Sequence, residues 1–163
     1  MSRPAANPIP EGLHSLTPMI VCKGAIGAID FYKRAFGAEE LSRLAGPDGN
    51  LLHASVRIGN SVLMLTEECL PMGARDPRGL GGTPVTIHLS VADVDAAFAR
   101  ATAAGANVLM PVAEMFWGAR YGVLTDPYGH SWSVATQVKD LTQDEIRAGM
   151  LKACAAQRPS AAA

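Results

Sequence analysis

The chain has 163 residues, of which 48% are hydrophobic, and its formal net charge at pH 7 is -1. This length fits one compact domain, or two small halves that share an interior, and the hydrophobic content excludes wholesale disorder. A net charge this close to zero means that basic residues are not in excess, which argues against nucleic acid as a partner.

The compartment is expected to be the cytoplasm. Every apolar stretch is interrupted by charges or glycine, and none approaches the roughly 20 residues of a membrane span. The residues from Met1 to Pro4 do not begin the long apolar segment of a secretion signal. Cys22, Cys69 and Cys154 form no Cys-x-x-Cys pair, which is typical of free thiols in a reducing compartment. We therefore expect no membrane partner.

The first half of the chain predicts a β-α-β-β-β unit over residues 14–66, after a flexible, Pro- and Ala-rich arm at residues 1–13. A strand-like run begins at Thr17, and an amphipathic helix follows that ends at Gly37, which can take the left-handed position after a helix. The hydrophobic period then changes to two. Two strands, residues 51–58 and 61–66, flank the turn signal at residues 59–60.

The second half repeats this pattern over residues 84–136, after a Gly- and Pro-rich linker at residues 67–83 that is long enough to act as a lid. Asp93 is a good cap for its helix. The steps from Thr17 to Thr86 and from Met64 to Ser133 are both 69 positions. Residues 139–163 predict a C-terminal helix and tail. The predicted fold class is α+β, with two tandem βαβββ modules that form a curved mixed sheet around a central cavity, helices outside.

Strand alternation identifies the side chains expected to face the cavity. In the first half, pairing across residues 59–60 turns the mixed polar face inward and the apolar face toward the helix. In the second half, pairing across residues 126–129 places Thr125 opposite His130; this turns Arg120 inward and Tyr121 toward the helix layer. With Trp117 from a nearby loop, the candidate ligand-binding residues are Thr17, Met19, His53, Ser55, Arg57, Met64, Thr86, His88, Trp117, Arg120 and Ser133.

Several motifs resemble the vicinal oxygen chelate superfamily, which includes glyoxalase I, bleomycin-resistance proteins and extradiol dioxygenases. They are the segments 28–32 (AIDFY), 36–38 (FGA) and 126–130 (DPYGH). Segment 116–122 (FWGARYG) is more similar to the PhnB-like subgroup. The resemblance covers roughly residues 13–138. It implies the fold, and it implies a homodimer whose pocket is shared or completed across subunits.

Metal-using members of this family place a His on the first strand and a Glu on the last strand of each half. These positions correspond here to Thr17 and Thr86, and to Met64 and Ser133. Three hydroxyls and a thioether are poor ligands for a catalytic divalent ion, which favours imidazole or carboxylate. The sequence therefore favours a protein without metal or other cofactor that binds a small molecule, either aromatic or anionic. The planar guanidinium groups of Arg57 and Arg120 each offer several N–H donors, which suits an anionic ligand.

The alternative is an enzyme of the same family, a lyase, isomerase or dioxygenase. It would use His53 or His88 as an acid/base group or in a displaced metal site. The interpretation that we favour for each histidine is a hydrogen bond to a neighbouring Ser or Thr in a polar pocket, and Trp117 could equally pack in the core or in an interface. Whether the chain is an enzyme stays open. Asp126 and His130, by contrast, are interpreted as structural residues of their turn.

Overall fold

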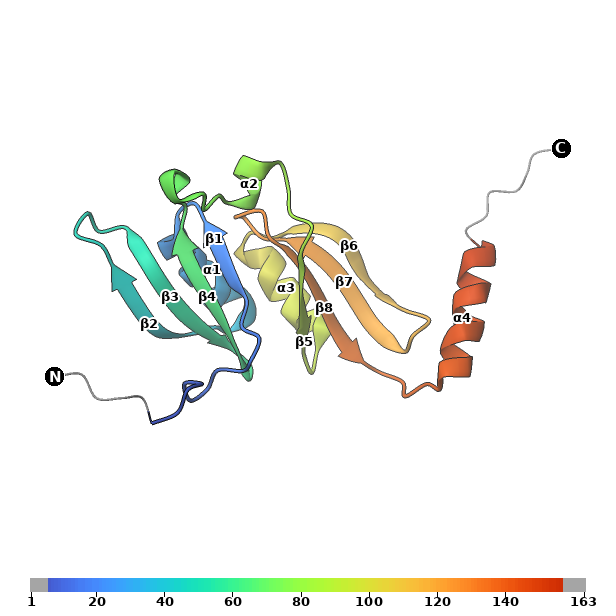
Figure 1. Cartoon of the computed structure of the whole chain (residues 1–163). Coiled ribbons are helices and arrows are strands. Elements are labelled where there is room, and N and C mark those ends of the chain that lie inside the picture. Colours follow the sequence, from blue (N-terminus) through green and yellow to red (C-terminus); the bar gives the residue numbers. More distant parts are fainter. Residues whose placement is uncertain (1–5, 157–163) are drawn as a thin grey trace.

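The structure, a computed structural model, describes residues 6–156. Residues 1–5 of the predicted arm and residues 157–163 of the predicted tail lie outside the described residues. The fold is α+β and consists of two βαβββ modules, each with one four-stranded mixed sheet (Figure 1). The predicted fold class is thus confirmed.

The first module has one helix and four strands. Its elements are β1 (Met19–Cys22), α1 (Ala25–Phe36), β2 (Glu39–Ala45), β3 (Leu51–Ile58) and β4 (Ser61–Glu67). The strand order is β1-β4-β3-β2. Strand β1 is parallel to β4, whereas β3 is antiparallel to both of its neighbours.

The second module has the same plan. After the linker, which contains a 3-10 turn (Leu70–Met72) and the short α2 (Pro77–Leu80), come β5 (Thr86–Ser90), α3 (Val94–Ala104), β6 (Asn107–Glu114), β7 (Ala119–Thr125) and β8 (Ser131–Gln137). The order is β5-β8-β7-β6, with β5 parallel to β8. A final helix, α4 (Gln143–Ala156), follows.

The two modules repeat each other residue for residue at their parallel strand pairs. Met19 lies opposite Met64 in the first sheet, and His88 lies opposite Ser133 in the second. Each residue of the second pair stands 69 positions after its counterpart, the same step that the sequence predicts. The strands that carry the candidate site are therefore equivalent in the two halves.

Local sequence signals explain where the helices begin and end. Gly37 ends α1 with φ 66° and donates its N–H to the carbonyl of Lys33. The Asp93 side chain accepts the N–H of Ala96 at 2.9 Å and so caps α3. Before α4, Thr142 and Glu145 satisfy each other's backbone N–H groups, the capping box that the sequence predicts.

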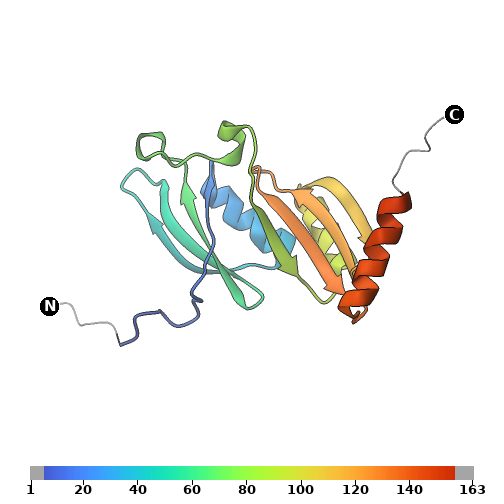
Figure 2. The same ribbon diagram turned by 45° about the vertical axis from the view of Figure 1, so that its right-hand side comes forward.

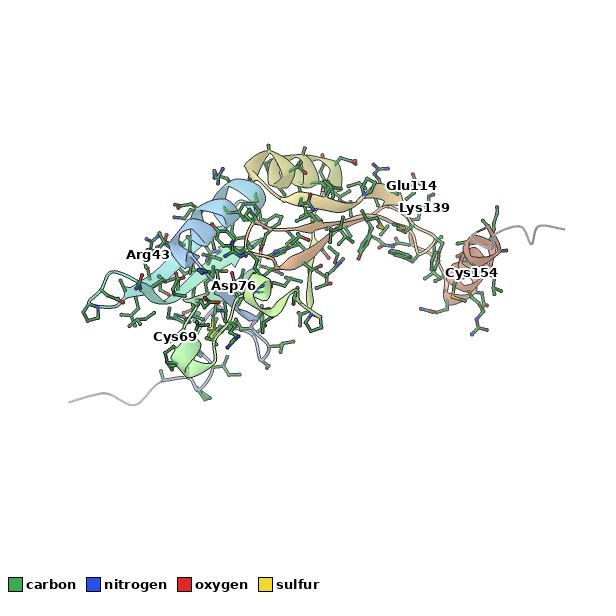
Figure 3. All side chains as sticks on the ribbon, turned by 90° about the horizontal axis from the view of Figure 1, so that it is seen from above. Arg43, Cys69, Asp76, Glu114, Lys139 and Cys154 are labelled. Atoms are coloured by element: carbon green, nitrogen blue, oxygen red, sulfur yellow. The ribbon has the colours of Figure 1, made fainter. Side chains whose placement is uncertain are left out.

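The core lies between the helices and one side of both sheets. Helices α1 and α3 cover the same side of the two sheets and pack against each other (Figure 3). An aromatic contact between α1 and β8 also joins the modules, since the ring centroids of Phe36 and Trp132 are 4.6 Å apart. The opposite side of each sheet, called here the inner face, is covered by neither α1 nor α3.

A buried carboxylate joins the modules. The Asp126 side chain accepts the Tyr32 hydroxyl at 2.6 Å and the Trp132 indole N–H at 2.9 Å. It also accepts the backbone N–H groups of Tyr128 and His130, at 2.9 and 3.0 Å. The His130 ring in turn contacts the Val21 carbonyl through Nε2 at 2.9 Å. Because Tyr32 and Val21 belong to the first module, this network fixes how the two modules pack.

The predicted register of the second hairpin is wrong by one residue. Thr125 lies opposite Ser131, not His130. The cause is a tighter turn: Gly129, at φ 90°, donates its N–H to the Asp126 carbonyl, and Asp126 pairs with His130. The slip reverses every β7 side chain. Arg120 therefore lies on the helix side, and Tyr121 lies on the inner face.

Helix α4 stands beyond the end of the second sheet (Figure 2), where Gly149 lies close to Phe116. None of its residues is buried, and Leu151 is 61% exposed. Within residues 6–156, no helix has both the length and the apolar character needed to cross a lipid bilayer.

Candidate functional site

Five predicted site residues lie on the inner face of the first sheet. Met64 pairs with both Met19 and Ser55, and Arg57 follows two positions after Ser55 on β3. Ser55 is buried, His53 is half-buried, and Met19 is 62% exposed. The Arg57 guanidinium is ion-paired with Glu39 of β2. The positive charge of Arg57 is therefore already balanced by the carboxylate of Glu39 within the sheet.

Two hydrogen-bonded pairs occupy the inner face of the second sheet. His88 Nδ1 lies 2.8 Å from Ser133 Oγ, and Thr86 Oγ1 lies 3.2 Å from Ser131 Oγ. Ser133 is only 3% exposed, whereas His88 is exposed. The ring Nε2 of His88 has no hydrogen-bond partner among the described residues. The pair thus holds the imidazole in place and leaves one nitrogen open.

Two aromatic side chains, Tyr121 and Trp117, adjoin this pair, and together with His88 they form what we call the aromatic row. The rings of His88 and Tyr121 are nearly parallel, at 17°, with centroids 6.2 Å apart. Trp117 meets Tyr121 edge to face at 5.6 Å. Such a row presents flat apolar surface beside a hydrogen-bonding imidazole.

Two cavities open next to His88. One, of about 630 Å³, is lined by His88, Ser90, Trp117, Ala135, Thr136 and Gln137 among others. The other, of about 390 Å³, lies between the modules and includes Thr17, His88 and the turn that joins β3 to β4. Both volumes lie in the range of small-molecule pockets. His53 lines neither of them, so the structure does not bring the two predicted histidines together in these cavities.

Arg120 belongs to the helix layer and not to the inner face. Its guanidinium donates to both oxygens of Asp95, in the first turn of α3, at 3.0 and 2.6 Å. The hydrogen bonds from Arg120 hold the pKa of the Asp95 carboxyl below its usual value. The inward orientation that the sequence predicted for Arg120 is wrong, because it rested on the slipped hairpin register.

The positions at which metal-using relatives carry ligands do not suit a divalent ion. Thr86 and Ser133 are hydrogen-bonded to neighbouring side chains, and Met64 offers a thioether next to Met19. Within residues 6–156, no three side chains among His, Cys, Asp and Glu gather in a metal-binding arrangement. The donor set therefore does not fit the ion of glyoxalase I-like enzymes.

Sequence reasoning missed Tyr121. The signal that could have found it is the glycine at the third loop position, Gly129. A glycine there is typical of a three-residue hairpin loop that ends in a left-handed residue. Applying that loop would have shifted the register by one residue and turned Tyr121 toward His88 and Trp117.

The comparison with family models identifies the chain. The Glyoxalase/Bleomycin resistance protein/Dioxygenase superfamily model matches residues 14–134, most of the chain. The protein belongs to this superfamily. Its sequence is also 50% identical over 139 residues to the uncharacterized protein Rv0887c of Mycobacterium tuberculosis, covering 83% of this chain and 82% of that protein. The uncharacterized protein Mb0911c of Mycobacterium bovis is also 50% identical over 139 residues, and the match covers 91% of that protein.

Solved structures agree on the fold. TioX from Micromonospora sp. ML1 superposes with a TM-score of 0.62 at 28% identity, covering 77% of this chain and 99% of TioX. The PhnB protein from Bacillus cereus superposes with a TM-score of 0.60 at 20% identity, covering 76% and 99%. The second likeness bears on the fold alone.

Proposed function

We propose that the protein binds a small, flat molecule on the inner face of its second sheet, without a metal ion. The observation that carries this proposal is the aromatic row, in which Trp117 and His88 line a cavity of about 630 Å³ and Tyr121 contacts both of their rings. Aromatic faces stack on flat ligands, and the open Nε2 of His88 supplies one hydrogen bond.

The ligand class follows from the charges near the row. Arg57 and Arg120, which were expected to hold an anion, are ion-paired with Glu39 and Asp95. An aromatic ligand is thus better supported than a purely anionic one. The proposal places the protein in the cytoplasm and, on the likeness of segment 116–122, in the PhnB-like subgroup of the superfamily.

The proposal also includes a homodimer in which a second copy covers the inner faces. Apolar side chains on or beside them are open to solvent: Met19 is 62% exposed and Leu44 is 60% exposed. Large exposed apolar surface marks an interaction site. In such a dimer the other ligand-binding candidates of the first sheet, His53, Ser55 and Met64, would be available to complete a site.

The test combines metal analysis with ligand screening. Protein purified without chelator is analysed for bound metals, and its melting temperature is followed with Ni, Zn, Mn or Fe salts and with 2-naphthoate. We expect less than stoichiometric metal and stabilisation by 2-naphthoate alone. His88→Ala should lower the affinity for 2-naphthoate about tenfold, or about 1.4 kcal/mol, with little loss of fold stability. Arg100→Ala, on the exposed side of α3, is the control.

Two results would contradict the proposal. One is a stoichiometric metal ion that survives purification. The other is a His88→Ala variant that unfolds early yet binds 2-naphthoate as before, because His88 would then serve packing and not binding.

A second candidate function, acid/base catalysis, is supported by the hydrogen bond between His88 and Ser133. At 2.8 Å, His88 Nδ1 is within proton-transfer distance of Ser133 Oγ. Turnover of an activated ester such as 4-nitrophenyl acetate that is lost in both His88→Ala and Ser133→Ala would favour this function over binding alone.

A further inference from the structure

A third cavity lies away from the aromatic row, under the linker that joins the modules. Its volume is about 320 Å³, and its wall is formed by β1, by linker residues including Pro77 and Leu80, and by Val85 just before β5. It shares Pro18 and Ile87 with the cavity between the modules and no residue with the cavity beside Trp117. The third cavity is therefore a separate place for a ligand.

The linker that roofs this cavity is firmly held. Asp76, which is 1% exposed, accepts the N–H of Gly79 at 2.9 Å and caps α2; Figure 3 shows it beside this helix. Arg78 donates to the carbonyls of Lys23 and Pro127, one in each module, at 3.0 and 3.2 Å. These contacts fix the roof before any ligand arrives, which lowers the entropic cost of binding.

His130 provides a polar group inside the cavity wall. Its Nε2 lies 2.9 Å from the Val21 carbonyl, which can only accept, so Nε2 is the donor of this hydrogen bond. In the neutral imidazole Nδ1 is then the acceptor, and it has no hydrogen-bond partner among the described residues. In residues 6–156, no buried side-chain nitrogen or oxygen lacks a partner. Nδ1 must therefore reach open space, and of the three cavities only this one is lined by His130.

The cavity also has a cation at its margin. Arg75 lines it, is exposed, and makes no ion pair with any described residue. The three arginines of the sheet strands, Arg43, Arg57 and Arg120, are all ion-paired. Arg75 is thus free to bind a carboxylate at the entrance.

We propose that the cavity under the linker is a second ligand site, which takes a small apolar carboxylate that also carries a hydrogen-bond donor. The apolar wall receives the body of the ligand, Arg75 binds its carboxylate, and the donor reaches His130 Nδ1. This site does not depend on the aromatic row, and a ligand bound here lies against different side chains.

The test uses three matched probes, 3-hydroxybenzoate, benzoate and 3-hydroxybenzyl alcohol, titrated into the full chain and followed by NMR. We expect 3-hydroxybenzoate to bind and to shift the His130 ring resonances, with the indole of Trp117 unchanged. Benzoate, which lacks the hydroxyl donor, and 3-hydroxybenzyl alcohol, which lacks the charge, should each bind more weakly. Arg75→Ala should weaken 3-hydroxybenzoate about fivefold, as expected for a partly exposed ion pair.

Two further variants keep the test decisive. Val85→Trp, at a position 63% exposed, should fill the cavity and abolish binding without disturbing the core. Arg100→Ala should change nothing. The proposal is overturned if no probe binds up to its solubility limit, if Arg75→Ala and Val85→Trp both bind like the native chain, or if binding shifts Trp117 and leaves His130 unchanged. The last result would assign the probe to the aromatic row.

Discussion

Asp126 is at the centre of the buried hydrogen-bond network that joins the two modules. Its two oxygens accept four hydrogen bonds, two from the side chains of Tyr32 and Trp132 and two from its own turn. The sequence indicated the turn bonds, because Asp often accepts backbone N–H groups two residues on. The bond to Tyr32 spans the modules, whereas the bond to Trp132 stays within the second module; neither could be predicted from local sequence.

Asp126→Asn should therefore destabilise the protein by about 2–4 kcal/mol, since the new amide would turn N–H groups toward existing donors in a buried site. The free energy of unfolding in urea measures this change. Asp140→Asn, at an exposed loop position, is the matched control. A loss no greater than that of the control would show that the carboxylate does not hold the modules together.

Two buried acids beside Asp126 predict how stability depends on pH. Burial, with the charge of Asp126 as the next cause, raises the pKa of the Cys22 thiol and of the Tyr32 hydroxyl well above their usual values. Both groups are neutral in the native state, so their contribution is complete below the unfolded pKa values and is lost as pH rises above them. Stability should fall by about 1.4 kcal/mol per pH unit for each group once pH exceeds its unfolded pKa.

Urea midpoints at about pH 8 and about pH 10.5 check this expectation, because the two conditions bracket the unfolded pKa values. The fall in stability should be smaller in Cys22→Ala and in Tyr32→Phe than in the native chain. An equally steep fall in both variants would mean that other groups cause it. Native Cys22 should also resist thiol reagents that label exposed Cys154.

At the scale of elements, the hairpins show what sequence can and cannot give. The first turn, Gly59-Asn60, has two residues, and the register predicted from it is confirmed at Ile58 and Ser61. The second turn contains a left-handed Gly129 and a side-chain bond, which shorten the loop by one residue. Because strand side chains alternate, this one-residue error in register placed Arg120 on the inner face instead of Tyr121. The aromatic row was therefore not predicted.

The loop that positions Trp117 makes an element-scale prediction. Gly118 has φ 89°, and a methyl group there would come well inside van der Waals distance of the Lys139 carbonyl. Gly118→Ala should cost about 2–4 kcal/mol, because backbone strain adds to a clash with backbone. It should also weaken 2-naphthoate binding by moving Trp117.

The control is Gly49→Ala, at a similar φ of 80° with no atom near the new methyl, which should cost only about 1 kcal/mol. Thermal unfolding of both variants gives the comparison. Equal losses would show that the loop moves aside freely and does not fix Trp117.

At the scale of the whole molecule, the repeat was visible in the sequence, but the arrangement of the two halves was not. The 69-residue step predicted two equivalent modules, which the strand pairing bears out. The modules pack through α1 on α3, through Phe36 on Trp132 and through Tyr32 on Asp126, all contacts between residues distant in the sequence. As a result, the inner faces are open in a single chain.

We expect a homodimer of twice the chain's 17.1 kDa in light scattering after size-exclusion chromatography. Met19→Asp, on the inner face, should shift the mass toward one chain, because a charge would be buried without a partner. Met72→Asp, at a linker position 84% exposed, should leave it unchanged. A single-chain mass at all concentrations, or equal effects of both variants, would contradict the dimer.

The most direct measurement of ligand binding at the aromatic row is a two-dimensional ¹⁵N NMR titration of the full chain with 2-naphthoate in the presence of chelator. The chain has two tryptophans, Trp117 in the row and Trp132 in the core, so two indole signals report on the two places. The Trp117 signal is the one that is missing from the spectrum of the Trp117→Phe variant. Binding at the aromatic row should shift the Trp117 signal and leave the Trp132 signal at its position. A Trp117 signal that never moves, or that moves only after a divalent metal is added, would contradict it.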